Sequence, residues 1–302
     1  MNDPSPLRAS DPIALATFDQ HRALLFSIAY RMLGSVADAE DMLQEAFIRW
    51  QLASNEEVRS AKALLVTVIT RLCVNHLQSA RVRRERYVGQ WLPEPIVTDP
   101  QYDPLGVIRA DESLSMALLV LLERLTAVER AVFLLHEVFR FKYAEIAGML
   151  GQSEANCRQV LRRARQHVGA VRQRFKTNSR EHRKLFDRFL EAARNGDMEG
   201  LIALLSTDVA LHIDGGGRAV VPNVIQGADK VVRGLLGGVR RLPDNLVMRK
   251  SMVNGQPGAI SYLDGKPYSV LVLDVADGRV RTVYIVSNPQ KLSHLPDLTE
   301  AP

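Results

Sequence analysis

Residues 143–168 read YAEIAGMLGQSEANCRQVLRRARQHV, two short amphipathic segments separated by a Gly-Gln turn. Ser153 stands immediately before the second segment, where its hydroxyl can cap a helix. With about 100° of rotation per residue, the apolar side chains of that helix share one arc, and Arg158, Gln159 and Arg162 lie on the opposite side. The turn, the cap and the two faces predict a helix-turn-helix. An ordinary helical hairpin with a solvated basic face is the alternative.

Basic side chains are concentrated in and after this motif. The net charge of the whole chain is only +5, yet the stretch from Arg158 to Lys184 holds ten Arg or Lys residues and one acid, Glu181. Arg158 and Arg162 are four residues apart on one helical face, which is unfavourable unless a polyanion lies opposite them. A second basic cluster, at residues 81–86, ends an earlier helical segment. Two such clusters favour a nucleic-acid partner.

The composition is that of a globular protein with more than one domain. The chain has 302 residues, of which 46% are hydrophobic. No apolar run reaches the roughly 18–20 residues of a membrane span, and the polar N-terminus does not read as a signal peptide, so we expect a cytoplasmic protein. Cys73 and Cys157 lack the spacing of a metal site or a disulfide framework. We therefore expect buried free thiols, no metal and no cofactor.

The hydrophobic periodicity divides the chain into two helical parts and one mixed part. Three amphipathic helices are predicted between residues 13 and 86, and the run WLPEP at 91–95 then imposes a fixed extended linker. Helices resume over 111–174, and beyond 177 a helix precedes strand-like runs punctuated by Asp-Gly turns, which predicts an α+β domain with a curved antiparallel sheet. The expected strands are Val209–Ile213, Leu246–Met252, Ala259–Leu263, Tyr268–Asp274 and Arg279–Val286.

The second and third helices carry unusual outer faces. Opposite the apolar stripe of residues 38–50 lie Asp41, Gln44 and Glu45, with Ile48 among them. An isoleucine ringed by acidic side chains can be a docking point for a protein partner, although single exposed apolar residues are common. The third helix ends in polar side chains followed by the arginine cluster, a combination suited to single-stranded or melted DNA.

Together these segments resemble the extracytoplasmic-function (ECF) group of sigma-70-type sigma factors. Residues 38–50, DAEDMLQEAFIRW, resemble the family's polymerase-docking helix in region 2, and residues 63–84 resemble the segment that melts and reads the −10 element. Residues 122–168 resemble region 4, whose recognition helix reads the −35 element. The resemblance, over about residues 13–175, implies a non-enzymatic protein that directs core RNA polymerase to promoter DNA.

The resemblance also implies which residues make these contacts. For polymerase binding they are Asp38, Asp41, Gln44, Glu45 and Ile48. For the −10 element they are Arg71, Asn75, His76, Gln78, Ser79, Arg81, Arg83 and Arg84. For the −35 element they are Glu154, Asn156, Arg158, Gln159, Arg162 and Arg163. Relatives often have Asn at position 71 and Asp-Arg or Asp-His at 75–76, which leaves the −10 sequence open.

Three further strings, YVGQWLPEP at 87–95, DGGG at 214–217 and NPQKL at 288–292, resemble a subgroup with a C-terminal SnoaL-like domain. In that subgroup the extension replaces a separate anti-sigma factor, which implies contact with the linker and with the DNA-binding domains. We expect region 2 at 1–87, the linker at 88–110, region 4 at 111–177 and a SnoaL-like α+β cone at 178–302. The glycine loop is expected to present backbone N–H groups to an exposed Glu94 or to a linker carbonyl. The implied interdomain residues are Trp91, Pro93, Glu94, Pro95, Asp214, Gly215, Gly216, Gly217, Asn288 and Pro289.

Two other functions are open from the sequence. SnoaL-like folds include enzymes with an Asp or His base, and Asp208, His212 and Asp214 are the available side chains near one strand. Alternatively, the chain is a ligand-sensing helix-turn-helix regulator that acts without polymerase, which would not need the acidic helix. The sequence leaves open whether a small molecule enters the C-terminal domain, whether that domain activates or represses, and the oligomeric state.

Overall fold

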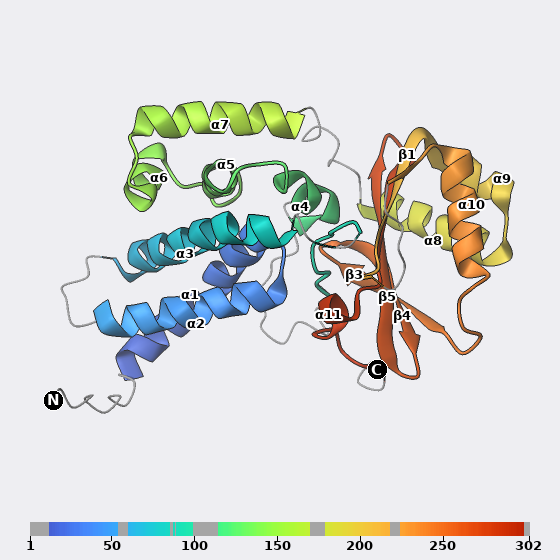
Figure 1. Ribbon diagram of the computed structural model, residues 1–302, viewed down its shortest axis with the longest axis horizontal. Helices are drawn as coiled ribbons and strands as arrows, with labels where there is room; N and C mark the ends of the chain where they lie inside the picture. The colour runs from blue at the N-terminus through green and yellow to red at the C-terminus, as the bar shows by residue number, and fades with distance from the viewer. Residues whose placement is uncertain are drawn as a thin grey trace.

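The structure is a computed structural model that describes residues 12–53, 60–84, 87, 89–98, 114–169, 179–217 and 224–298. Figure 1 shows two bodies side by side, helices α1 to α7 in one and a sheet covered by helices α8 to α10 in the other, with the linker segment between them.

Three long helices form the N-terminal part, as the periodicity predicts. They are α1 (Pro12–Leu33), α2 (Val36–Ala53) and α3 (Ala61–Arg84). Gly34, with φ of +68°, ends α1 in the left-handed conformation and lets α2 fold back against it. The Trp50 indole donates to the Ala14 carbonyl at 2.8 Å, so the end of α2 lies beside the start of α1.

The second helical part contains the predicted helix-turn-helix. Its elements are α4 (Met116–Leu122), α5 (Ala127–Phe133), a π-helical turn η2 (Leu134–Val138), α6 (Tyr143–Leu150) and α7 (Glu154–Val168). Gly151, with φ of +65°, closes α6, and the Ser153 hydroxyl accepts a hydrogen bond from the Asn156 backbone N–H at 3.2 Å. A turn glycine and an N-cap at the predicted positions confirm the motif.

The two helical parts share one hydrophobic core. Side chains from α1 and α3, such as Leu33 and Ile69, belong to the same buried cluster as Val132 of α5 and Ile146 of α6. Arg130 of α5 is itself buried and donates to the Met32 carbonyl at 2.6 Å, at the end of α1. The helix-turn-helix therefore packs directly on the N-terminal helices in this structure.

The C-terminal part is a six-stranded sheet in the order β2-β1-β6-β5-β4-β3. The two hairpins at the Asp-Gly turns are present, but the expectation of a purely antiparallel sheet is wrong, because β1 and β6 run parallel. The sequence analysis did not predict strand β2, the short helix α11 or helix α10, whose glycines weaken its helical pattern. The bounds are α8 (Ser179–Asn195), α9 (Met198–Leu204), β1 (Leu205–Asp214), β2 (Ile225–Gln226), α10 (Ala228–Val239), β3 (Val247–Val253), β4 (Gln256–Leu263), β5 (Lys266–Ala276), β6 (Arg279–Val286) and α11 (Pro289–Leu292).

Both faces of the sheet are covered. Helices α8, α9 and α10 pack on one face, where Phe186 and Phe189 are fully buried. The other face belongs to a cluster that includes Leu92 of the linker, Met116 of α4 and Tyr284 of β6. The linker and the first helix of the second helical part are thus built into the sheet's hydrophobic packing (Figure 1).

Among the described residues no helix has the length and hydrophobicity needed to cross a membrane. The same residues contain no group of three or more His, Cys, Asp or Glu side chains suited to a metal ion. Cys73 and Cys157 are buried and unpaired thiols.

Candidate functional site

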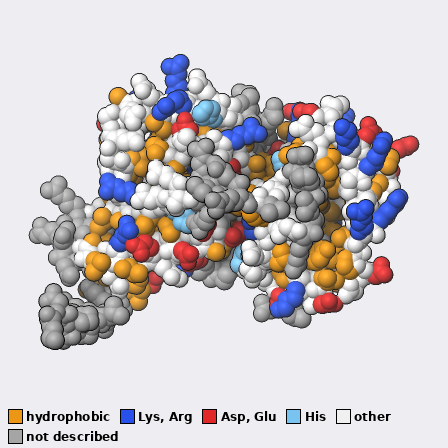
Figure 2. All heavy atoms as spheres, in the orientation of Figure 1, with side chains coloured by type: hydrophobic (Ala, Val, Ile, Leu, Met, Phe, Trp, Pro, Cys, Tyr) orange, Lys and Arg blue, Asp and Glu red, His pale blue; other side chains and the backbone are white. Residues whose placement is uncertain are grey.

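Helix α7, the predicted recognition helix, presents its polar face to solvent. Gln159, Arg162 and Arg163 are exposed, and Glu154 and Arg158 form an exposed ion pair of 2.7 Å. The Asn156 side-chain amide donates to the side-chain oxygen Oε1 of Gln152 at 3.0 Å. Opposite these side chains, Cys157, Val160, Leu161, Ala164 and Val168 are buried. Figure 2 shows Lys or Arg side chains over α7.

The predicted −10 residues occupy different environments along α3. Asn75, Gln78 and Ser79 are exposed, and His76 is half-buried with its Nε2 3.5 Å from an Asp38 carboxylate oxygen. Arg71 is exposed, but its guanidinium donates to two carbonyls at the end of α6, those of Met149 at 2.6 Å and Gly148 at 3.2 Å. The side chains of Arg81, Arg83 and Arg84 lie outside the described residues.

The predicted polymerase surface lies along the outer side of α2. Asp41, Gln44 and Ile48 are exposed, whereas Asp38 and Glu45 are half-buried, and Glu45 accepts a hydrogen bond from Arg49 at 2.8 Å. Ile48 does not stand alone. Leu52, one turn further on, is 76% exposed, and Ile13 at the start of α1 is also 76% exposed. We call Ile48 and Leu52, which are four residues apart on one face of α2, the apolar patch; Figure 2 shows hydrophobic side chains on this outer end of α1 and α2.

The linker is fixed to the N-terminal helices around Glu94. The Glu94 carboxylate accepts a hydrogen bond from the Val36 N–H at 2.7 Å, and the Glu94 N–H donates to the Gly34 carbonyl at 2.8 Å. The expectation of an exposed Glu94 facing the glycine loop is therefore wrong, because the side chain is buried at the start of α2. A Cβ atom at Gly34 would lie 2.9 Å from the Trp91 ring, so the glycine also makes room for that ring.

On its other side the linker is held by a buried ion pair. Asp214, at the end of β1, is 0% exposed and lies 2.7 Å from Nζ of Lys291. Its carboxylate also accepts hydrogen bonds from the Leu92 N–H at 2.9 Å and from the Tyr87 hydroxyl at 2.5 Å. Lys291 donates to the Leu92 carbonyl at 2.5 Å, and its ammonium lies 4.1 Å from the centre of the Trp91 ring.

The glycine loop after β1 contacts the C-terminal string. A Cβ atom at Gly216 would come within 2.4 Å of the Asn288 side chain and would displace it, and the φ of +57° also favours glycine here. The Asn288 amide donates to the Tyr87 hydroxyl at 2.8 Å, and its oxygen accepts from the Gln290 N–H at the start of α11. Pro289 occupies the first position of that helix. Burial and the bond to Asp214 raise the pKa of Tyr87.

A third contact joins the linker to the β3–β4 hairpin. Asn254 has φ of +51° and is buried; its backbone N–H donates to the Ile96 carbonyl at 2.8 Å. Its side-chain amide donates to the Tyr30 hydroxyl at 2.7 Å, and that hydroxyl donates to the Glu94 carbonyl at 2.6 Å. Val97 adds a single bridge to Val253, so this part of the linker runs beside the edge of the sheet.

Sequence reasoning missed several residues of this contact, among them Tyr30, Tyr87, Asn254 and Lys291. Tyr87 and Lys291 belong to the strings that mark the subgroup, so their only signal was that resemblance. Tyr30 falls within an ordinary apolar stripe, and Asn254 is followed by Gly255 as in any hairpin turn.

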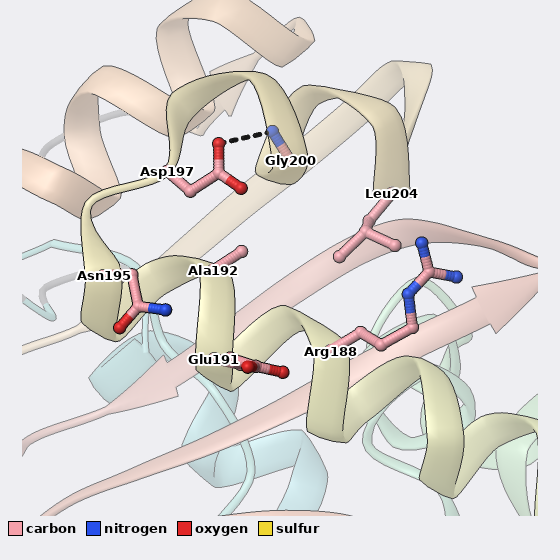
Figure 3. A pocket seen from close by; sticks show the side chains of 7 residues that line it. All are labelled: Arg188, Glu191, Ala192, Asn195, Asp197, Gly200 and Leu204. Carbon is pink, nitrogen blue, oxygen red and sulfur yellow. Dashed lines mark hydrogen bonds between the residues drawn. The ribbon is translucent and has the colours of Figure 1, made fainter.

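The three side chains considered for catalysis do not form one site. Asp208 is exposed and pairs with Arg281 at 3.0 Å, whereas the buried Asp214 carboxylate accepts a hydrogen bond from the linker residue Leu92. His212 stacks on Tyr284 with ring centres 5.4 Å apart, and burial lowers its pKa. A separate cavity of about 220 Å³ lies between α8 and α9, where Asp197 accepts from the Gly200 N–H at 2.8 Å (Figure 3). Its lining contains none of the three, and consists of Arg188, Glu191, Ala192, Asn195, Asp197, Gly200 and Leu204.

Known protein families and individual proteins match most of this chain. Residues 17–83 match the family Sigma-70 region 2, and residues 115–168 match Sigma-70, region 4. The chain is 37% identical over 296 residues to the ECF RNA polymerase sigma factor SigJ of Mycobacterium tuberculosis, covering 93% of this chain and 94% of that protein. It is 34% identical to the probable ECF RNA polymerase sigma factor SigI of the same species, covering 94% and 96%. The crystal structure of SigJ superposes with a TM-score of 0.76 at 35% identity, covering 92% of this chain and 98% of SigJ.

Proposed function

Because the chain belongs to the ECF RNA polymerase sigma factors, we propose that α2 binds core polymerase, that α3 and α7 bind promoter DNA, and that the C-terminal domain regulates how these parts are arranged. Such a protein acts in the cytoplasm, where core polymerase meets the genome.

The polymerase contact is supported by the outer side of α2. The apolar patch of Ile48 and Leu52 lies on the same face of α2 as Asp41 and Gln44, so it is larger than the single isoleucine that the sequence suggested. Clustered apolar side chains next to acidic ones are typical of a protein interface. We infer that Ile48 and Leu52 make the central contact and that Asp41 gives it charge specificity.

The promoter contact is supported by the exposed polar face of α7. Arg158, Gln159 and Arg162 project from one side of a capped helix, as an element that enters the major groove requires. An arginine that makes a bidentate contact to guanine discriminates between bases by about 1–3 kcal/mol. These side chains are therefore expected to set the −35 preference, and the exposed Asn75, Gln78 and Ser79 to contribute to −10 recognition.

The regulatory proposal rests on one observation. The linker is hydrogen-bonded to the N-terminal helices on one side and to the C-terminal domain on the other. Glu94 binds the start of α2, while Asp214, Lys291 and Asn254 of the C-terminal domain bind the residues around it. The linker connects the two promoter-binding parts, so a domain that fixes its path restricts their separation. The Asp214 carboxylate is already hydrogen-bonded to Tyr87, and Asp208 lies at the surface in an ion pair. Both observations support a regulatory domain without catalytic activity.

Run-off transcription with purified core polymerase tests this proposal. Asp214→Ala and Gly216→Val disrupt the linker contact, and Asp208→Ala is the matched control, since Asp208 lies on the same strand in an exposed pair. We expect the first two to change promoter output and to alter the dimensions of the free protein in small-angle scattering, with the control unchanged. Wild-type transcription and wild-type scattering from both linker variants would contradict regulation through the linker.

The alternative of a regulator that works without polymerase has a direct test. A duplex carrying the promoter is titrated with the full chain, with and without core polymerase. A sigma factor is expected to need polymerase for tight, specific binding, whereas equally tight binding by the chain alone would favour the alternative.

A further inference from the structure

The guanidinium of Arg158 is held in place although it is exposed. Its central carbon lies 4.9 Å from the centre of the Tyr143 ring, and its Nη2 donates to Glu154 at 2.7 Å. The side chain is nevertheless 56% exposed, so it is oriented without being covered. Arg162 is exposed one turn later on the same helix, and within the described part of the chain no ring or carboxylate holds it in this way.

The Tyr143 ring is itself in contact with a second ring. The His136 ring stacks on it, with centres 4.5 Å apart and planes 24° from parallel. His136 Nδ1 lies 3.1 Å from the Phe141 carbonyl oxygen, within hydrogen-bonding distance. His136, Tyr143 and Arg158 therefore form a continuous series of contacts, in which the two rings are half-buried and the guanidinium is exposed.

Unusual backbone conformation brings His136 to this position. Residues 134–138 form a π-helical turn, closed by a hydrogen bond from the Phe139 N–H to the Leu134 carbonyl at 3.0 Å. Arg140 follows with φ of +61°, which is uncommon for a residue with a side chain. Both features have an energetic cost and are frequent at functional sites. A plain turn between α5 and α6 would need neither.

We propose that His136 and Tyr143 are positioning residues for promoter reading: their stacked rings hold Arg158 in the orientation in which it contacts one base pair of the −35 element. The inference rests on the proposed role of α7 in DNA recognition. An exposed arginine loses much rotational freedom when it makes a fixed contact, and a side chain that is oriented beforehand loses less. The ion pair with Glu154 limits the remaining rotation further.

The size of the effect follows from the cation–π contact. At exposed sites such contacts are worth about 0.5–1 kcal/mol, which corresponds to about a 2- to 5-fold change in binding. Tyr143→Leu should therefore reduce the preference at one base position by about 2- to 5-fold. Tyr143→Phe keeps the ring and should retain the preference.

The experiment uses holoenzyme reconstituted from core polymerase and the full chain, with a pool of promoter fragments randomised in the −35 element. The variants are Tyr143→Leu, Tyr143→Phe, Arg158→Ala and the double variant Tyr143→Leu/Arg158→Ala, with Arg162→Ala as the matched control. We expect Tyr143→Leu and Arg158→Ala to relax the same position, the double variant to relax it no further than Arg158→Ala, and Arg162→Ala to relax a different one. His136→Leu, which removes the ring behind Tyr143, replaces Tyr143→Leu if that protein does not fold.

Three results would overturn the proposal, and they are distinguishable. Equal relaxation at every position by Tyr143→Leu, or no relaxation at all, would show that the ring only fills space. An unchanged profile for Arg158→Ala would instead mean that this arginine does not read DNA, so the assignment of Arg158 within the proposed function would fail as well.

Discussion

Lys291 and Asp214 form an ion pair of 2.7 Å that is buried between the C-terminal domain and the linker, 77 residues apart in the chain. Removing one partner of such a pair leaves an uncompensated buried charge, which costs about 3–5 kcal/mol, whereas replacing both is often nearly neutral. We therefore expect Asp214→Asn and Lys291→Met each to lower the free energy of unfolding strongly, and the double variant to recover part of the loss. Denaturant unfolding measures this, with Asp208→Asn as the exposed control, expected to cost at most about 1 kcal/mol. Additive losses in the double variant would contradict the coupling.

Tyr30 gives a prediction at high pH. Burial, the largest cause, raises the pKa of its hydroxyl, so the folded protein keeps the proton at pH values where the unfolded chain, with a pKa of about 10, releases it. The stability provided by the neutral hydroxyl is complete below about pH 10 and is lost as the pH rises further. Tyr30→Phe should cost about 1–3 kcal/mol near neutral pH, since Asn254 loses its acceptor, and should flatten the decline above pH 10. Thermal melting from pH 8 to 11 measures both effects, and an equally steep decline in the variant would contradict the assignment.

The apolar patch gives a prediction for polymerase binding. Ile48→Glu and Leu52→Glu place a charge in an exposed apolar surface, and Asp41→Lys reverses a charge beside it. Each should weaken affinity for core polymerase at least about 10-fold, which corresponds to about 1.4 kcal/mol, with little change in stability. Glu191→Lys, a charge reversal on exposed α8, is the control. Wild-type affinity for all three α2 variants would remove α2 from the interface.

Arg71 gives a prediction for the contact between the two helical parts. Its bonds to the Met149 and Gly148 carbonyls join α3 to the end of α6. Arg71→Ala should cost about 0.5–1.5 kcal/mol and increase the radius of gyration of the free protein, because the packing of α6 on α3 is weakened. Asn75→Ala, exposed one turn later on α3, serves as the control for both measurements. If scattering profiles of the two variants coincide, Arg71 does not hold the parts together.

The sequence by itself determined the elements whose signals are local. The cap at Ser153, the left-handed glycine at 151 and the apolar arc of α7 all lie within one short segment, so the helix-turn-helix could be predicted and is confirmed. The Asp-Gly hairpins and the three N-terminal helices follow for the same reason. Helix α10 was missed because its glycines at 234, 237 and 238 carry no helical preference, and packing on the sheet stabilises it instead.

Only the tertiary structure shows which residues are contacted by the three segments at 87–95, 214–217 and 288–292. Glu94 reads as an exposed carboxylate in a proline-rich linker, yet it binds Val36, 58 residues earlier. Tyr30 reads as part of a core stripe, yet its hydroxyl bonds to Asn254, 224 residues later. The parallel pairing of β1 with β6 likewise depends on a connection that no local pattern encodes. Periodicity reports which face of an element is buried, but a buried polar group finds its partner only when distant segments pack together, and that partner is specified by the whole fold.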